Sequence, residues 1–161
     1  MNNQSSLQKE AEKLDSQELS YLEQSNILAQ PNAEKAMLDY VVSRKILHYK
    51  ILPQIFDLAN ASEIIMEYIQ NKIWFDDDIL LKLFDLPNAE NIVLEYVRNS
   101  GILSSEALQK IYALPQASEI ILEYVQNGFY LSDEDIIKIR ELPRGKEILT
   151  IYTNISQNLR K

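Results

Sequence analysis

A 28-residue repeat constrains the fold of this chain more than any other feature of its sequence. The copies align without gaps and begin at Gln30, Leu58, Leu86, Leu114 and Leu142, and the last one stops after its first part. Three repeat positions define the alignment. Four of the five prolines occupy the first position: Pro31, Pro87, Pro115 and Pro143. Every copy has a small residue at the second (Ala33, Ala61, Ala89, Ala117 and Gly145) and a tyrosine at the third (Tyr40, Tyr68, Tyr96, Tyr124 and Tyr152). Periods of about 20 to 50 residues are typical of stacked units that bury their apolar faces only against their neighbours.

Each copy predicts two helices. In the first half, apolar residues such as Ile92 and Tyr96 recur at helical spacing. The second half opens with a side chain that can accept hydrogen bonds from free helix N–H groups, which is Asp76, Ser104 or Ser132 in three copies. The sequence therefore predicts an all-α fold, an α-solenoid of stacked two-helix repeats with a 28-residue period.

Local signals also predict where helices begin and end. First helices should end at Asn99-Ser100-Gly101 and Asn127-Gly128, because these residues tolerate a left-handed conformation. Ser132 and Asp135 have the spacing of a capping box. Pro53 falls inside the expected second helix of the first copy, so that helix should begin late, near Leu52.

The repeat divides the chain into two segments. Residues 30–161 are predicted to form the helical-repeat domain, with units starting at 30, 58, 86, 114 and 142. Residues 1–29 are predicted to be a tail and a capping helix, because Leu7, Ala11, Leu14 and Leu22 form a helical stripe that does not follow the 28-residue register. A terminal cap with a polar outer face keeps a repeat protein soluble.

Charge and composition limit the partners of this chain. The net charge of −8 disfavours nucleic acids and anionic lipid surfaces, both of which attract Lys and Arg. No apolar run approaches the roughly 20 residues that cross a bilayer, and the chain has no cysteine for disulfides or zinc–thiolate sites. We therefore expect a soluble protein without a nucleic-acid partner or membrane insertion, whose partner is a protein, more easily a basic one.

Catalytic and metal chemistry has no convincing set of residues. His48 is the only histidine, and no acid lies within the helical turn before it. The run Asp76-Asp77-Asp78 lacks the spacing of a calcium loop, so it is interpreted as a helix cap. Phosphate-loop, dinucleotide and nucleophile-elbow motifs are absent. We expect no enzymatic activity, catalytic residue, metal site or cofactor.

An acidic column on the first helices is one candidate binding surface. We call it the acidic ridge, and its members share one helix face: Asp39, Glu67, Glu95 and Glu123. One interpretation is an ordinary solvated face; the other is a docking surface for a basic protein. The turn aromatics Trp74 and Tyr130 form a second candidate, since they either pack or anchor a partner. The tyrosine column is interpreted as core, with its hydroxyls at the rim.

The last helix has apolar residues where earlier copies are polar. Ile151 replaces the ridge acid, and Ile155 replaces an asparagine. With Ile148 and Leu159 they form a stripe, and exposed stripes usually mark interfaces. The stripe predicts self-association or a protein partner; a fold-back of residues 156–161 and a solenoid that continues further are the alternatives.

The segments LPNAENIVLEYV and LPQASEIILEYV, each followed by a short second helix, resemble helical repeats of effector proteins from intracellular bacteria such as Legionella. This resemblance implies a protein of the bacterial cytoplasm, or one secreted into a host cell, that binds a host protein or another effector. The function expected is a non-enzymatic protein–protein interaction module. Alternatives are an inhibitor or regulator of a partner enzyme, and an acidic nucleic-acid mimic that occupies a DNA-binding protein.

Overall fold

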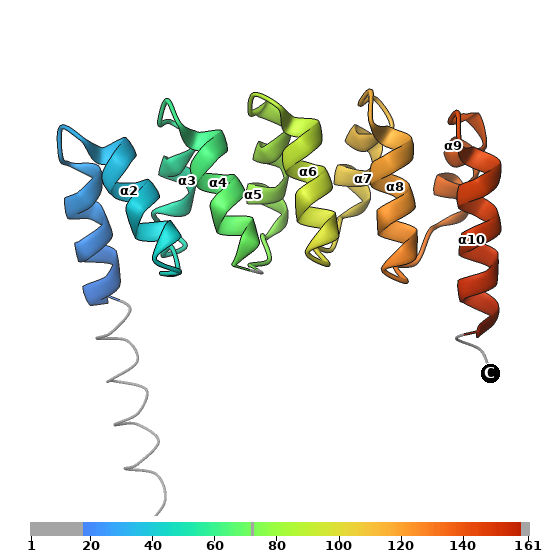
Figure 1. Ribbon diagram of the computed structural model, residues 1–161, viewed down its shortest axis with the longest axis horizontal. Coiled ribbons are helices and arrows are strands. Elements are labelled where there is room, and N and C mark those ends of the chain that lie inside the picture. Colours follow the sequence, from blue (N-terminus) through green and yellow to red (C-terminus); the bar gives the residue numbers. More distant parts are fainter. Residues whose placement is uncertain (1–17, 72, 159–161) are drawn as a thin grey trace, which may run out of the picture. The chain divides into compact units, whose positions relative to one another are not determined.

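The structure is a computed structural model that describes residues 18–71 and 73–158. These residues form helices and no strand, which confirms the predicted all-α class (Figure 1). Residues 18–28 are helical, and the further elements are α2 (Ala33–Val42), α3 (Leu52–Ile55), α4 (Ala61–Gln70), α5 (Asp77–Lys82), η1 (Leu83–Asp85), α6 (Ala89–Arg98), α7 (Ser105–Ile111), α8 (Ala117–Gln126), α9 (Asp133–Glu141) and α10 (Gly145–Asn158).

The predicted tail and capping helix is described only in part. Residues 1–17, which include Leu7, Ala11 and Leu14, lie outside the described residues. The described remainder is helical from residue 18 to residue 28.

The first helix of each repeat begins at the small-residue column. Helices α2, α4, α6 and α8 each have 10 residues and start at an alanine, whereas α10 has 14 residues and starts at Gly145. These alanines are buried, and a Cβ added at Gly145 would collide with the carbonyl oxygen of Ile139 in α9. The column is small because the chain turns tightly there from a second helix into the next first helix.

The second helices begin at the capping residues that the sequence predicts. Asp76 accepts a hydrogen bond from the Ile79 amide at 3.0 Å, and Ser104 accepts one from the Ala107 amide at 3.2 Å. Ser132 and Asp135 form the complete capping box. Helix α3 is short and starts at Leu52, with the following proline in its first turn, where a missing N–H costs nothing.

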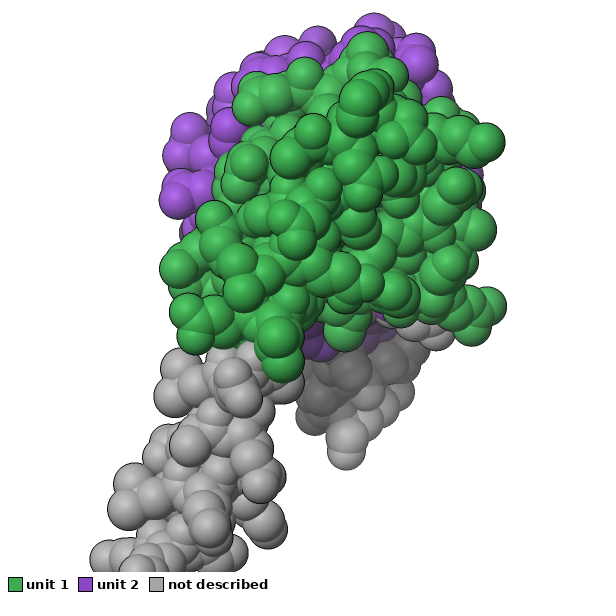
Figure 2. Space-filling view, turned by 90° about the vertical axis from the view of Figure 1, so that its left-hand side faces the viewer, with its two compact units in different colours: residues 1–68 green, residues 69–161 purple. Residues whose placement is uncertain are grey.

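The chain contains two compact units, residues 1–68 and residues 69–161 (Figure 2). In the second unit, α6, α8 and α10 lie side by side in one row, while α5 packs against α7 and α9 packs against α10 (Figure 1). One isoleucine column occupies the core of both units, because its members are at most 1% exposed: Ile64, Ile92, Ile120 and Ile148.

Enlarging a residue of the small-residue column should destabilise the fold. Ala89 is buried at the start of α6, and overpacking a filled core typically costs about 1 to 3 kcal/mol. We expect Ala89→Leu to lower the free energy of unfolding by that amount in urea titrations followed by circular dichroism. Ala113→Leu makes the same change at an exposed alanine and should have little effect; equal unfolding midpoints for the two variants would contradict the close contact.

Candidate functional site

A short extended segment follows each of the first helices α2, α4, α6 and α8. The segments occupy residues 45–48, 73–76, 101–104 and 129–132, again at intervals of 28. Successive side chains of an extended chain point to opposite sides. In every segment the second residue is therefore exposed and the third is buried against the helices. We call the exposed residues the loop column, and they are Ile46 (66% exposed), Trp74 (67%), Ile102 (54%) and Tyr130 (78%).

Tyrosine hydroxyls hold these loops in place. The Tyr68 hydroxyl lies 3.2 Å from the Leu47 amide nitrogen and 3.4 Å from the Leu47 carbonyl oxygen. The Tyr152 hydroxyl makes the same pair of contacts with the Leu131 backbone, both at 3.4 Å. A phenol can accept from an N–H and donate to a carbonyl at once, so one side chain satisfies both backbone groups of the buried loop residue.

In the middle of the second unit, the Tyr96 hydroxyl bonds the backbone of two loops. Tyr96 accepts a hydrogen bond from the Phe75 amide at 3.4 Å and donates one to the Ile102 carbonyl at 3.3 Å. It therefore contacts the loop on each side of its own helix. The Tyr96 ring also stacks on the Phe75 ring at 5.3 Å. Trp74 and Ile102 are presented outward because their neighbouring backbone is fixed by this one tyrosine.

Left-handed residues turn the chain from α2, α6 and α8 into the loops that follow them. Arg44, Ser100 and Gly128 occupy the same repeat position, and their φ angles are 59°, 64° and 81°. Gly101 follows one of these turns, where a Cβ would collide with the Tyr96 ring. The predicted helix ends are thus correct in position, although at 99–101 the serine adopts the left-handed conformation and the glycine provides space for the tyrosine.

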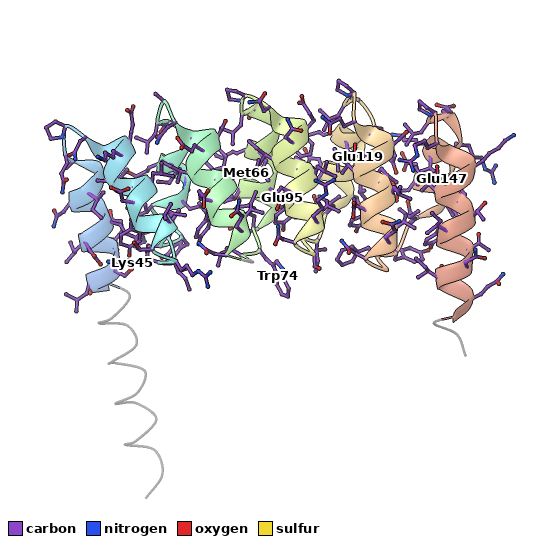
Figure 3. The ribbon with its side chains drawn as sticks, viewed as in Figure 1. Lys45, Met66, Trp74, Glu95, Glu119 and Glu147 are labelled. Carbon is purple, nitrogen blue, oxygen red and sulfur yellow. The ribbon has the colours of Figure 1, made fainter. Side chains whose placement is uncertain are left out.

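Each aromatic residue of the loop column borders an open groove. Trp74 lines a groove of about 340 Å³ together with Arg98, Asn99 and Ser100, which end the next first helix. Tyr130 lines a groove of about 370 Å³ beside Tyr152 on α10. Figure 3 shows the Trp74 side chain projecting away from the helices at one edge. The loop column is therefore an apolar series with space beside its aromatic members.

The sequence prediction covered half of the loop column. It named Trp74 and Tyr130 but missed Ile46 and Ile102, which lie in the same column of the repeat. The 28-residue period could have identified them, because every loop has two adjacent apolar residues at these two repeat positions. The prediction that Trp74 and Tyr130 contact a partner stays a prediction.

The acidic ridge is partly neutralised in the second unit. The Arg98 guanidinium lies 3.2 Å from the Glu119 carboxylate and 3.6 Å from that of Glu123. Glu95 accepts a hydrogen bond from the Asn99 side chain at 3.1 Å; Figure 3 shows Glu95 and Glu119 on neighbouring helices. In the first unit Asp39 is exposed, whereas Glu67, like Glu95 and Glu123, is half-buried. These contacts leave less free charge on the ridge than the sequence suggests.

The apolar stripe of α10 is divided between the core and the surface. Ile148 is fully buried, whereas Ile151 and Ile155 are half-buried. Leu159 lies outside the described residues. The stripe therefore offers a partner only the middle of the helix, around Ile151 and Ile155.

The single histidine, His48, lies in a local cluster of contacts. His48 Nδ1 accepts a hydrogen bond from the Lys50 amide at 3.2 Å, and its ring packs near Tyr21 and Tyr49. Within the described ranges, no group of His, Cys, Asp or Glu residues is arranged to hold a metal ion. Among the helices described, none has both the length and the apolarity to cross a membrane.

Comparisons with known proteins give no match to a family, to a curated protein or to a solved structure. The resemblance to bacterial effector repeats therefore stays a prediction.

Reversing the charge of the acidic ridge tests its role as a docking surface. We expect Glu67→Lys/Glu95→Lys/Glu123→Lys to slow association with a basic protein partner and to flatten its salt dependence, because charges at the rim of an interface act mainly by steering the encounter. The control makes the same three charge changes in a separate acidic column, whose members are exposed: Asp57→Lys/Asp85→Lys/Glu141→Lys. Stopped-flow association rates that change equally in both triple variants, or in neither, would exclude a specific role for the ridge.

The loop-holding tyrosines should make the fold sensitive to alkaline pH. Burial raises the pKa of Tyr68, Tyr96 and Tyr124 above the ordinary value of about 10, because the folded protein favours the neutral phenol. Their contribution to stability is complete below about pH 10 and should be lost as the pH rises from there through the raised pKa values. Tyr96→Phe should lose less unfolding free energy between pH 8 and pH 11 than wild type.

The matched control is Tyr130→Phe, which makes the same substitution at an exposed tyrosine. Urea titrations at each pH, with tyrosine ionisation followed by ultraviolet absorbance, measure the effect. A Tyr96→Phe variant with the wild-type pH profile would show that this phenol does not couple folding to pH.

Proposed function

We propose that this chain is a solenoid of two-helix repeats with a 28-residue period, and that it is a non-enzymatic module that binds a protein through the loop column. The observation that carries this proposal is the large exposed apolar side chain at one position of every loop, on backbone fixed by tyrosine. Isolated exposed apolar residues are common on protein surfaces, but a regular series is not.

The fixed backbone favours binding. A partner that docks on a flexible loop must order it, which costs about 0.5 to 1.5 kcal/mol for each side chain that is immobilised. The tyrosine hydrogen bonds have already ordered the loops around Trp74, Ile102 and Tyr130. Tryptophan and tyrosine are also enriched among the residues that dominate binding energy.

The spacing of the loops suggests the shape of the partner. Neighbouring first helices such as α6 and α8 pack together, which sets successive loops about 8 to 10 Å apart. About seven residues of an α-helix, or three of an extended strand, cover this distance. A partner segment with apolar side chains at either interval could place one beside each loop.

The charges beside the loop column favour a basic partner. In the second unit, exposed acids lie in the helix turn that follows each loop: Asp77, Asp78, Glu106, Asp133 and Glu134. They also stabilise the starts of their helices, so their effect on a partner adds to a structural role. The partner class remains that of the effector resemblance, a host protein or another effector, and inhibition of a partner enzyme is one outcome of such binding.

A nucleic-acid mimic is less well supported. Such a protein needs unpaired carboxylates along one face, and the Arg98 contacts with Glu119 and Glu123 reduce that charge. Binding to a DNA-binding protein that DNA displaces, and that falls steeply with salt, would favour the mimic instead.

The loop column can be tested with its own fluorophore, because Trp74 is the only tryptophan and is exposed. Segments selected from a displayed peptide library against the purified protein should shift Trp74 emission to the blue on binding. Ile102→Ala/Tyr130→Ala should weaken their binding by about tenfold or more, since anchor truncation typically costs over 1 kcal/mol.

The control Val42→Ala/Ile137→Ala removes two exposed apolar side chains outside the loop column and should bind like wild type. Selected segments that leave Trp74 emission unchanged and bind both double variants equally would contradict the proposed site.

A further inference from the structure

Contacts between one second helix and the next suggest which kind of helix could pack on the far side of α9. The Tyr112 hydroxyl at the end of α7 donates a hydrogen bond to the Asp135 carboxylate in the first turn of α9, at 3.0 Å. Lys138 of α9 also lies 5.5 Å from the centre of the Tyr112 ring. The end of one second helix therefore meets the first turn and middle of the next.

The positions of Tyr112 and Asp135 have counterparts in other copies of the repeat. The last counterpart of Tyr112 lies late in the described sequence, and the first counterpart of Asp135 lies near its beginning. Arg140 of α9 is 28 residues after Tyr112 and is exposed. The column of Asp135 begins with Glu23 in the helical segment 18–28. The later members of that column are buried, and they are Ile51, Ile79, Ala107 and Asp135, whereas Glu23 is 52% exposed. Suppose that the helical segment 18–28 of another copy packed on α9 in the way that α9 packs on α7. Its Glu23 would then take the position of Asp135, and Arg140 would take the position of Tyr112, so that the Glu23 carboxylate would lie opposite Arg140.

The buried loop residues give a second, independent match. Leu19 lies in the column of Leu47, Phe75, Leu103 and Leu131, which are at most 8% exposed, yet Leu19 itself is 62% exposed. On the other face, the groove of about 370 Å³ beside Tyr152 is lined by Leu131, Ile136 and Thr153 among others. Thr153 is exposed, although its column-mates Ile69, Val97 and Val125 are fully buried. If a second copy continued the repeat, its exposed Leu19 would therefore meet the partly apolar groove beside Tyr152.

The two side chains that the register would place opposite each other carry opposite charges. Glu23 is acidic and exposed, whereas Arg140 is basic and exposed. Helices α9 and α10 are together close to neutral, because residues 133–158 contain four Lys and Arg residues against five Asp and Glu residues. The electrostatic attraction at this contact therefore comes from the Glu23–Arg140 pair itself.

We propose that copies of this chain associate head to tail, with the helical segment 18–28 of one copy packed on α9 and α10 of the next. Glu23 then lies opposite Arg140, and Leu19 occupies the groove beside Tyr152. Such a contact is heterologous, because different surfaces of the two copies meet. The inference rests on the repeat stacking proposed above but uses no residue of the loop column except Tyr130 at the groove rim.

Charge-swap variants test this contact. Arg140→Glu gives both surfaces an acidic residue at the contact, and Glu23→Arg gives both a basic one, so neither variant should associate with itself. Sedimentation-velocity and light-scattering measurements over a range of concentrations should show a wild-type mass that rises with concentration. Each variant alone should have its association constant lowered by about tenfold or more, since like charges that face each other repel.

An equimolar mixture of the two variants should associate again, because each acidic surface then meets a basic one. This recovery also shows that both variants are folded, and circular dichroism melts give an independent check, which Glu23→Arg requires because Glu23 also pairs with Lys45. Lys110→Glu makes the same charge change on the exposed side of α7 and should associate like wild type.

Three results would overturn the proposal. They are a wild type that stays monomeric at every concentration, an Arg140→Glu variant that associates as strongly as wild type, and a mixture that associates no better than the separate variants. Loss of association without any change in loop-column binding would separate this contact from the proposed binding function.

Discussion

The loops of this protein depend on hydrogen bonds between tyrosine hydroxyls and loop backbone. A four-residue extended segment between two helices has N–H and C=O groups without helical partners, and burying them unpaired costs about 1 to 3 kcal/mol each. The Tyr68 and Tyr152 hydroxyls supply both a donor and an acceptor to the buried residue of a loop. Phenylalanine would fill the same core volume but leave those groups unsatisfied, which explains why this buried column is tyrosine.

The hydroxyl of Tyr40 also needs a hydrogen-bond partner, but residues 18–20 are helical where later copies have a loop. Gln24 lies in the column of Leu52, Leu80 and Leu108 but is a fully buried amide. Its Nε2 lies 3.0 Å from the Tyr40 hydroxyl and 3.1 Å from the Ile46 carbonyl, and its Oε1 accepts from the His48 amide at 2.8 Å. A buried amide is tolerated because its polar atoms are paired, so a glutamine takes over the role of loop backbone.

The sequence predicted features that depend on local chemistry, and it missed those that depend on packing. Helix positions and the caps at Asp76, Ser104 and Ser132 follow from short-range patterns. In Ile102-Leu103 both residues are apolar, so their composition does not predict which one is buried. Leu103 is buried because the Tyr96 and Tyr124 hydroxyls form hydrogen bonds with the loop backbone and fix its orientation. The Arg98 contacts with Glu119 and Glu123 likewise join residues more than 20 positions apart.

Head-to-tail association would change the affinity of the proposed loop-column site. One loop offers a partner a single apolar side chain, which gives weak binding. In the proposed solenoid, binding at a second loop is intramolecular once the first loop is occupied, so it costs little further translational entropy. Copies that join in the repeat register would continue this series of sites beyond one chain. A partner with several suitable segments would then bind the assembly far more tightly than the monomer, whereas a partner with one segment would not.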